Sequence, residues 1–134
     1  MQLTMKKIVL ILILLLSSSS IYAVSCKEPL DIKDCLTFLG NSPAQTAHNF
    51  GVGYYTGQGV LQDYKEAVKW FGRAAEQGHV EAQYKLGYMY HYGKGVPQDY
   101  KEAFKWYRKS AEQGHASALL SLAFMYKDGL FGKK

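Results

Sequence analysis

The sequence predicts an all-α protein made of stacked helix pairs, present in about two and a half copies. The main observation is an internal repeat of 36 residues: Thr46 to Glu81 aligns without gaps with Ala82 to Ser117, and 18 of these 36 positions are identical. A partial third copy starts at Ala118. One helix pair cannot bury both faces of its tryptophan and tyrosine side chains, so the copies are expected to stack as a helical solenoid.

The composition is that of a globular protein. The chain has 134 residues, of which 48% are hydrophobic and 20% charged, which suits a single domain. We expect five segments: a signal peptide (1–23), an N-terminal cap segment (24–43), a first repeat (44–81), a second repeat (82–117), and the first helix of a third repeat with a C-terminal tail (118–134).

Each copy is predicted to fold as two helices separated by glycines. In the second copy the first helix starts at Ala82 and is broken by Gly93, since glycine adopts left-handed backbone angles at low cost. Asp99 opens the second helix, Glu102 completes the pattern of a reciprocal capping box, and Gly114 ends the helix. Apolar positions recur with helical spacing in both helices: Ala82, Leu86, Met89 and Tyr90 in the first, and Ala103, Trp106, Tyr107 and Ser110 in the second.

Two further signals concern the first helix of each copy. Ser42 and Pro43 supply an N-cap and an N1 proline, with Gln45 at the third helical position, so the first repeat is expected to begin there. Gly51 and Gly87 occupy the same repeat position inside the helices. Because an interior glycine costs a helix about 1 kcal/mol, we expect a neighbouring helix to approach closely at this position.

The N-terminus has the order of a secretory signal peptide. Lys6 and Lys7 form a basic region, Ile8 to Leu16 are nine consecutive aliphatic residues, and Ser17 to Ser20 begin a polar exit. A transmembrane anchor is the alternative, but about 20 apolar residues are needed to cross a bilayer. We therefore expect export to the periplasm or the exterior.

Two maturation routes are compatible with this leader. Ordinary cleavage would follow Ala23, whereas Ala23 to Cys26 resembles a bacterial lipobox in which Cys26 would carry a lipid and anchor the protein. In an oxidising compartment Cys26 and Cys35 are candidates for a disulfide, which lipidation of Cys26 would exclude. The mature chain would hold 14 Lys and Arg against 11 Asp and Glu, a net charge of +3, which does not indicate nucleic acid as a partner.

The repeat motif resembles the Sel1-like repeat family, which is related to tetratricopeptide repeats. The residues that carry the resemblance are Ala82, Leu86, Gly87, Tyr90, Gly93, Gly95, Val96 and Asp99, followed by Ala103, Trp106, Tyr107, Ser110, Ala111, Glu112 and Gly114. The resemblance covers Ala44 to about Gly129. It implies a right-handed α/α solenoid with a concave groove and a role as a protein-interaction adaptor or scaffold, often in exported bacterial proteins. The third repeat departs from the motif because it lacks a second helix and has Leu130 and Phe131 where the second repeat has Lys94 and Gly95.

In related helical repeats the first helix of each pair lines the concave surface. The predicted partner-binding residues are those off the core stripe of these helices: Glu81, Tyr84, Tyr88, His91, Tyr92, His48, Val52 and Tyr55. Aromatic side chains with polar tips are common anchors in binding sites. Alternatively, several of these tyrosines pack between repeats.

A basic patch is predicted on the second helices. Its residues are four apart and recur at equivalent positions in the two repeats: Lys65, Lys69, Arg73, Lys101, Lys105 and Lys109. An acidic glycan or an anionic membrane surface is a candidate partner. The alternative is a solvated helix face in which Glu66 and Glu102 compensate part of the charge.

Catalytic and cofactor motifs are not apparent in the sequence. No two of the four histidines are three or four residues apart and no HExxH occurs, so a zinc site is not expected. There is no GxSxG and no SxxK. Some cysteine-rich relatives are associated with β-lactam binding or hydrolysis, which makes a small enzyme of that kind the alternative function, but those relatives carry cysteine pairs in each repeat. Both cysteines of this chain precede the repeats, so we expect a binding protein without a cofactor.

The third repeat is expected to present an apolar side. Without a second helix to cover it, its first helix should expose Leu119, Leu122 and Met125. Self-association through this end of the solenoid is one interpretation, and a truncated copy of a longer repeat protein is the other.

Overall fold

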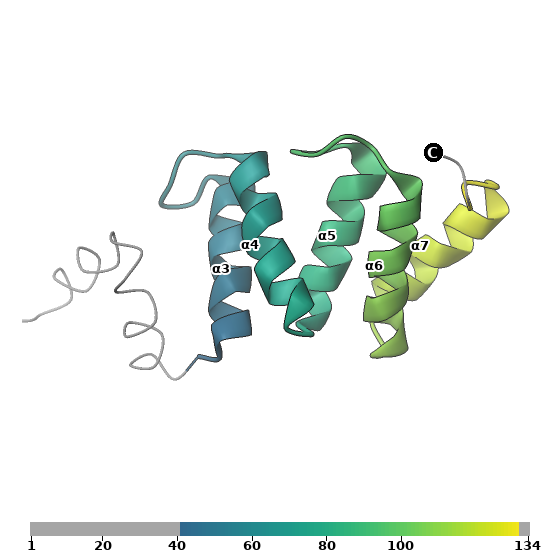
Figure 1. Cartoon of the computed structure of the whole chain (residues 1–134), viewed down its shortest axis with the longest axis horizontal. Helices are drawn as coiled ribbons and strands as arrows, with labels where there is room; N and C mark the ends of the chain where they lie inside the picture. The colour runs from purple at the N-terminus through teal and green to yellow at the C-terminus, as the bar shows by residue number, and fades with distance from the viewer. Residues whose placement is uncertain (1–40, 132–134) are drawn as a thin grey trace, which may run out of the picture. The chain divides into compact units, whose positions relative to one another are not determined.

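The computed structural model describes residues 41–131, which form five α-helices and no strand. The helices are α3 (Pro43–Thr56), α4 (Tyr64–Glu76), α5 (Val80–Tyr92), α6 (Tyr100–Glu112) and α7 (Ala116–Lys127). Each helix packs on the next one along the chain, so the five stand side by side in a row (Figure 1). The predicted all-α solenoid of helix pairs is confirmed; the leader, Cys26 and Cys35 lie outside the described residues.

The helices begin at the caps that the sequence indicates, with one correction. The Ser42 side chain accepts a hydrogen bond from the Gln45 backbone N–H at 3.2 Å, and the Asp99 carboxylate accepts from the Glu102 N–H at 3.1 Å. The reciprocal half of the expected capping box is wrong. The Asp99 backbone N–H donates instead to the Tyr90 carbonyl at 2.9 Å, so it is not available to Glu102, whose carboxylate pairs with Lys105 at 3.0 Å.

The starts of the first helices also differ from the prediction. Helix α5 begins at Val80, two residues before the expected Ala82, because the His79 side chain is its N-cap and accepts a hydrogen bond from the Ala82 N–H at 3.2 Å. Helix α7 repeats this arrangement, with His115 accepting from the Ala118 N–H at 3.2 Å. Each histidine therefore ends the interhelical turn and starts the next repeat.

The core follows the apolar stripes and passes between the repeats. One cluster of buried side chains joins α3, α4, α5 and α6, and a second joins α6 and α7. Met125 corrects an expectation: it is fully buried, not exposed, because it packs with Ala103 and Tyr107 of α6, and Leu122 is half-buried beside them.

The glycines inside the first helices mark the predicted close approach. A Cβ placed on Gly51 would lie 2.6 Å from the ring of Phe71, and one on Gly87 would lie 2.7 Å from the ring of Tyr107. Real Cβ atoms do not approach a ring this closely. The second helix of each repeat thus lays a fully buried ring directly on the backbone of the first helix.

Candidate partner-binding surface

The predicted groove residues lie on the first helices α3 and α5, and most of them are half-buried. Tyr92 is the exception, with 57% of its surface exposed. The half-buried residues are Glu81, Tyr84, Tyr88, His91, His48, Val52 and Tyr55. Their polar groups gather in two clusters, one near the N-terminal ends of α5 and α7 and the other near the C-terminal ends of α3 and α5.

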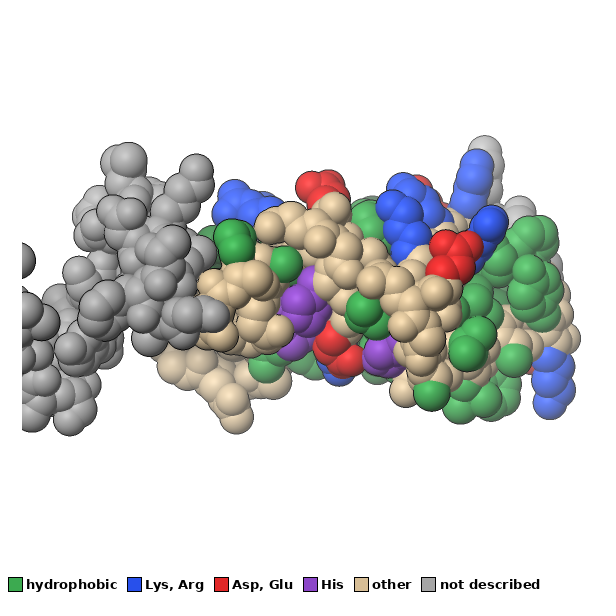
Figure 2. Space-filling model, turned by 90° about the horizontal axis from the view of Figure 1, so that it is seen from below, with side chains coloured by type: hydrophobic (Ala, Val, Ile, Leu, Met, Phe, Trp, Pro, Cys, Tyr) green, Lys and Arg blue, Asp and Glu red, His purple; other side chains and the backbone are tan. Residues whose placement is uncertain are grey.

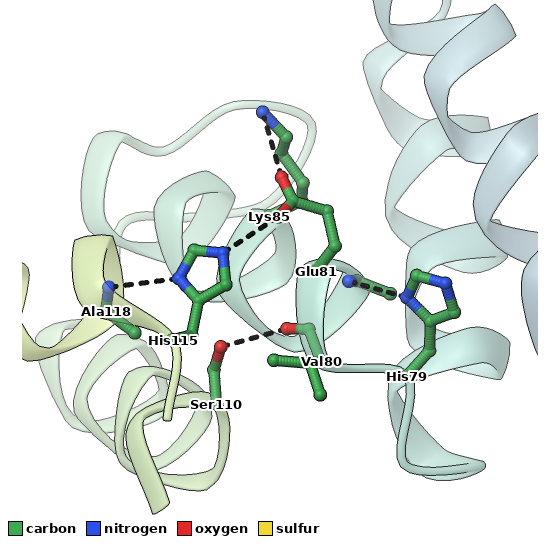
Figure 3. Close-up of polar contacts among 8 residues, drawn as sticks. His79, Val80, Glu81, Lys85, Ser110, His115 and Ala118 are labelled. Carbon is green, nitrogen blue, oxygen red and sulfur yellow. Dashed lines mark hydrogen bonds and ion pairs between the residues drawn. The ribbon is translucent and has the colours of Figure 1, made fainter. Parts of the chain in front are cut away.

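The first cluster, here called the Glu81 cluster, consists of Glu81, Lys85, His115 and Tyr84. His115 Nε2 lies 2.8 Å from one carboxylate oxygen of Glu81, and Lys85 Nζ lies 3.7 Å from the other (Figure 3). The Tyr84 ring stacks on the His115 ring at a centroid distance of 4.7 Å. Seen from below, an acidic patch lies between two patches of histidine atoms (Figure 2). The cluster links the α7 cap to α5 of the preceding repeat.

The other junction uses the same histidine position with a different partner. His79 Nε2 lies 3.0 Å from the amide oxygen of Gln45 on α3, and its ring stacks on His48 at 4.5 Å. In both junctions the histidine Nδ1 accepts from a backbone N–H, so the proton of the neutral imidazole lies on Nε2 and points toward an oxygen. From the sequence the histidines were considered as possible zinc ligands, and the missed signal was that a helix starts directly after His79 and His115.

Burial and neighbouring charges shift the pKa values of several of these groups. Burial lowers the pKa of His48 and of His79, and the charge of His79 lowers that of His48 further. Burial acts to raise the pKa of Glu81, but the hydrogen bond from His115 and the charge of Lys85 outweigh it, and the pKa is lowered. At neutral pH the surface therefore presents an ionised Glu81 carboxylate together with the neutral imidazoles of His48 and His79.

The second cluster, here called the Lys94 cluster, surrounds an ammonium group with tyrosine rings. Lys94 follows α5 and donates a hydrogen bond to the Tyr55 hydroxyl of the preceding repeat at 3.1 Å. Its Nζ lies between 5.2 and 5.6 Å from the ring centroids of Tyr55, Tyr64 and Tyr88, within the range of cation–π attraction. Lys94 thus connects the two repeats near the C-terminal ends of α3 and α5. No sequence pattern indicated this role, although Lys94 lies between Gly93 and Gly95.

Packing explains why the tyrosines of this surface are not equivalent. The Tyr84 ring lies 4.7 Å from His115 and 5.7 Å from Tyr107, and it belongs to the partly buried shell of the second core cluster. Tyr92 instead packs at a tilt on Tyr88 at 4.5 Å, stacks on His91 at 4.6 Å and keeps an open face. The interpretation that some tyrosines pack between repeats applies to Tyr84, whereas Tyr92 offers an accessible ring.

The predicted basic patch lies on α4 and α6, and all six of its side chains are exposed. Lys69 forms an ion pair with Glu66, and Lys105 forms one with Glu102, so two of the charges are partly compensated. The remaining residues of the patch are Lys65, Arg73, Lys101 and Lys109. Two of them lie over tryptophan rings: Arg73 over Trp70 and Lys109 over Trp106, each at 4.6 Å.

The described part of the chain holds no cluster of metal ligands. Within residues 41–131 no three histidine, cysteine or carboxylate side chains come together as metal ligands. The rings of His48 and His79 stack nearly parallel, with an angle of 14° between their planes, so their nitrogens do not converge on one point. The described helices are also too short or too polar to cross a membrane.

Comparison with solved structures identifies the class as helical-repeat solenoids. A protective antigen present in uropathogenic Escherichia coli strains, which displays an SLR fold, matches with 45% identity and a TM-score of 0.64 over 64% of this chain and 18% of the other. A Sel1 repeat protein from Oxalobacter formigenes matches with 39% identity and a TM-score of 0.61 over 61% and 24%. The chain therefore spans only a quarter or less of these two relatives. Cysteine-rich protein B of Helicobacter pylori matches with 23% identity and a TM-score of 0.57 over 65% and 68%, which shows a shared fold.

The family assignment rests on the repeats themselves. The Sel1 repeat signature matches residues 48–79, 80–115 and 116–134, which is more than half of the chain, and the chain belongs to this family. Sel1 repeats typically serve protein–protein interaction and generally form scaffolds without enzymatic activity. A search of curated protein sequences gives no match.

Proposed function

We propose that this chain is an exported interaction module that binds a partner protein or an extended peptide on the first-helix surface of α3 and α5. The observation that carries the proposal is the row of tyrosine and histidine rings on these helices, which ends in the exposed Tyr92. Its ring is held by Tyr88 and His91, so it loses little conformational freedom when a partner covers it. Large rings of this kind are frequent hot spots in interfaces.

The Glu81 cluster adds a polar contact to this surface. The Glu81 side chain is 41% exposed and ionised, and its hydrogen bond from His115 fixes its direction. A fixed carboxylate beside the half-buried Tyr84 ring suits a partner segment that presents a cationic or amide group next to an apolar one. The partner is therefore proposed to be bound through ring stacking and one charged contact.

The decisive variant is Tyr92→Ala. Because Tyr92 is exposed, we expect the fold and the thermal midpoint to remain nearly unchanged, while affinity for the captured partner falls about tenfold or more. Tyr84→Ala is unsuitable as a test of binding, since the Tyr84 ring packs on His115 and Tyr107 and its loss would lower stability.

The experiment pairs affinity capture from the native exported fraction with mass spectrometry and titration of the partner that is found. Leu61→Ala serves as the matched control, because Leu61 is 91% exposed and lies outside the first-helix surface. Equal capture by wild type, Leu61→Ala and Tyr92→Ala would contradict the proposed surface.

Export and maturation form a separate part of the proposal. The leader expected over residues 1–23 supports release after Ala23, or lipidation of Cys26. The intact mass of the protein recovered from its host distinguishes these routes: a chain beginning at Val24 indicates ordinary cleavage, and an acylated chain beginning at Cys26 indicates a lipoprotein. Retention of residues 1–23 would contradict export by a cleaved leader.

The basic patch is proposed as a secondary contact with an acidic glycan or an anionic membrane surface. All six cationic side chains are exposed, and Lys65 and Lys101 pair with no carboxylate within the described residues. Replacing both by glutamate should weaken binding to vesicles that contain anionic lipid, and added salt should do the same to the wild type. Binding that is insensitive to both would exclude this contact.

A further inference from the structure

The outer side of α7 carries apolar side chains that no described helix covers. The clearest case is one repeat position, occupied by Ala47 on α3, Gln83 on α5 and Leu119 on α7, where the residue is 5%, 4% and 54% exposed. Three further exposed residues continue this line along α7 and define, with Leu119, the α7 stripe: Ala116, Leu119, Ala123 and Tyr126. Hydrophobic side chains gather at this end of the described solenoid (Figure 2).

The repeats show what this stripe is shaped to receive. Ala123 occupies the position of Gly51 and Gly87, where the rings of Phe71 and Tyr107 bring the second helix of each repeat onto the first. The stripe is therefore the equivalent of a face that a helix covers in both preceding copies. Its spacing of three, four and three residues is that of a two-stranded helical seam, with a small residue near the middle that permits close approach.

The charge of α7 indicates which helix fits. From Ala116 to Lys127 only Lys127, at the C-terminal end, is charged, so the stripe offers no ion pair to a charged partner and does not repel a copy of itself. The stripe is uncharged and has the large side chains of Leu119 and Tyr126 on either side of the small Ala123, so its shape and polarity are complementary to those of a second copy. A two-fold axis at Ala123 would set Leu119 of one copy against Tyr126 of the other, and the reverse, as an isologous contact requires.

The available area is in the range of a weak dimer. Leu119 and Tyr126 of the stripe are more than half exposed, and so are Leu120 at its edge and Phe131, which stacks on Tyr126. If each of these four contributes roughly 100 Å², pairing two copies removes roughly 800 Å² from water, which is the size of a weak, transient interface. Dissociation at micromolar concentration is the affinity to expect from such an interface.

We infer that this protein dimerises through α7, which pairs with α7 of a second copy in an antiparallel arrangement around Ala123. An antiparallel pair places the two Lys127 ammonium groups at opposite ends and aligns the helix dipoles favourably, whereas a parallel pair would bring both together. The inference goes beyond the proposed partner binding, because the α7 stripe shares no residue with the Glu81 or Lys94 cluster.

Sedimentation equilibrium of the full chain over roughly 1–100 µM tests the dimer. We expect a dimer that increases with concentration, at least tenfold weaker association in Leu119→Lys, and no change in the equally charged control Leu61→Lys. Circular dichroism establishes that each variant is folded. A wild type that stays monomeric, or a dimer that Leu119→Lys leaves intact, would overturn the inference.

Crosslinking tests the geometry and does not depend on a destabilising change. Ala123→Cys should form a disulfide between the two introduced cysteines under mild oxidation, identified by the mass of the joined peptide, because both lie at the two-fold axis. Lys127→Cys should not, since the two positions lie at opposite ends of an antiparallel pair. Efficient crosslinking at 127 and none at 123 would refute the antiparallel arrangement.

Discussion

Replacing Gly87 by alanine tests the physical reason for the repeat packing. Alanine is the better helix former by about 1 kcal/mol, so an exposed or loosely packed site would gain stability. Here the new Cβ would lie 2.7 and 2.9 Å from two carbons of the Tyr107 ring and 3.2 Å from the Ala103 carbonyl oxygen. The ring is 1% exposed and the carbonyl belongs to the α6 backbone, so neither moves easily.

The magnitude follows from two opposing terms. Overpacking a tight contact costs typically about 1–3 kcal/mol, and in this case the α5–α6 pair must separate by several tenths of an ångström. Set against the gain in helix propensity, the net loss expected for Gly87→Ala is up to about 2 kcal/mol. For a domain of this size that corresponds to a lowering of the thermal midpoint by up to roughly 16 °C.

The matched control is Gly72→Ala on α4, where a new Cβ meets nothing within 4 Å. This variant should be stabilised by about 0.5–1 kcal/mol, since it gains helix propensity without a clash. Both variants are compared with the wild type by urea and thermal unfolding followed by circular dichroism. A Gly87→Ala protein as stable as Gly72→Ala would refute the close-approach argument.

Three further predictions concern the loops, the α7 core and the pH dependence. Gly95→Ala should be strongly destabilising, because the backbone is left-handed and the new Cβ would overlap the Tyr64 carbonyl oxygen. Gly59 is also left-handed but lies in open space, so Gly59→Ala should cost only about 1–2 kcal/mol, and thermal unfolding compares the two variants. Met125→Ala should lose about 2–5 kcal/mol by urea unfolding because the side chain is fully buried, and a loss below 1 kcal/mol would speak against its place in the core. Burial lowers the pKa of His48 and His79, so on acidification the two histidines bind protons more readily in the unfolded chain than in the folded one. Stability should therefore decline as the pH falls below about 6.5, and equal thermal midpoints at pH 8 and pH 5 would contradict this.

The fold was predictable from the sequence because the repeat reveals it twice. A feature that returns after 36 residues, such as Gly51 and Gly87, has a shared structural cause, and the close helix contact is that cause. The inward stripe of the second helix was also predictable, since Ala103 and Tyr107 recur with helical spacing and are buried. Periodicity is a local property, and both features follow from it.

The misses arose where partners come from another repeat. His79 and His115 cap helices while contacting oxygens 34 residues earlier, a relation that no local pattern contains. Histidine is also an uncommon N-cap, so the helix starts were placed too late. Met125 was expected to be exposed because the third repeat lacks a second helix. It is buried because it packs against α6 of the preceding repeat, a contact that the local pattern does not contain.

The candidate surface is harder to predict because function depends on positions where the copies differ. At the histidine junctions the geometry is the same, but the acceptor is the neutral Gln45 in one and the charged Glu81 in the other. Lys94, which follows Gly93 at the end of α5, reaches the Tyr55 and Tyr64 rings of the preceding repeat, whereas its equivalent Leu130 is half-buried against the second core cluster. Identical positions therefore encode the stacking, and the substitutions give each junction its own charge and polarity. A partner that binds along the first helices would meet a different chemical group at each step, which is how a repetitive scaffold can recognise a single, non-repetitive sequence.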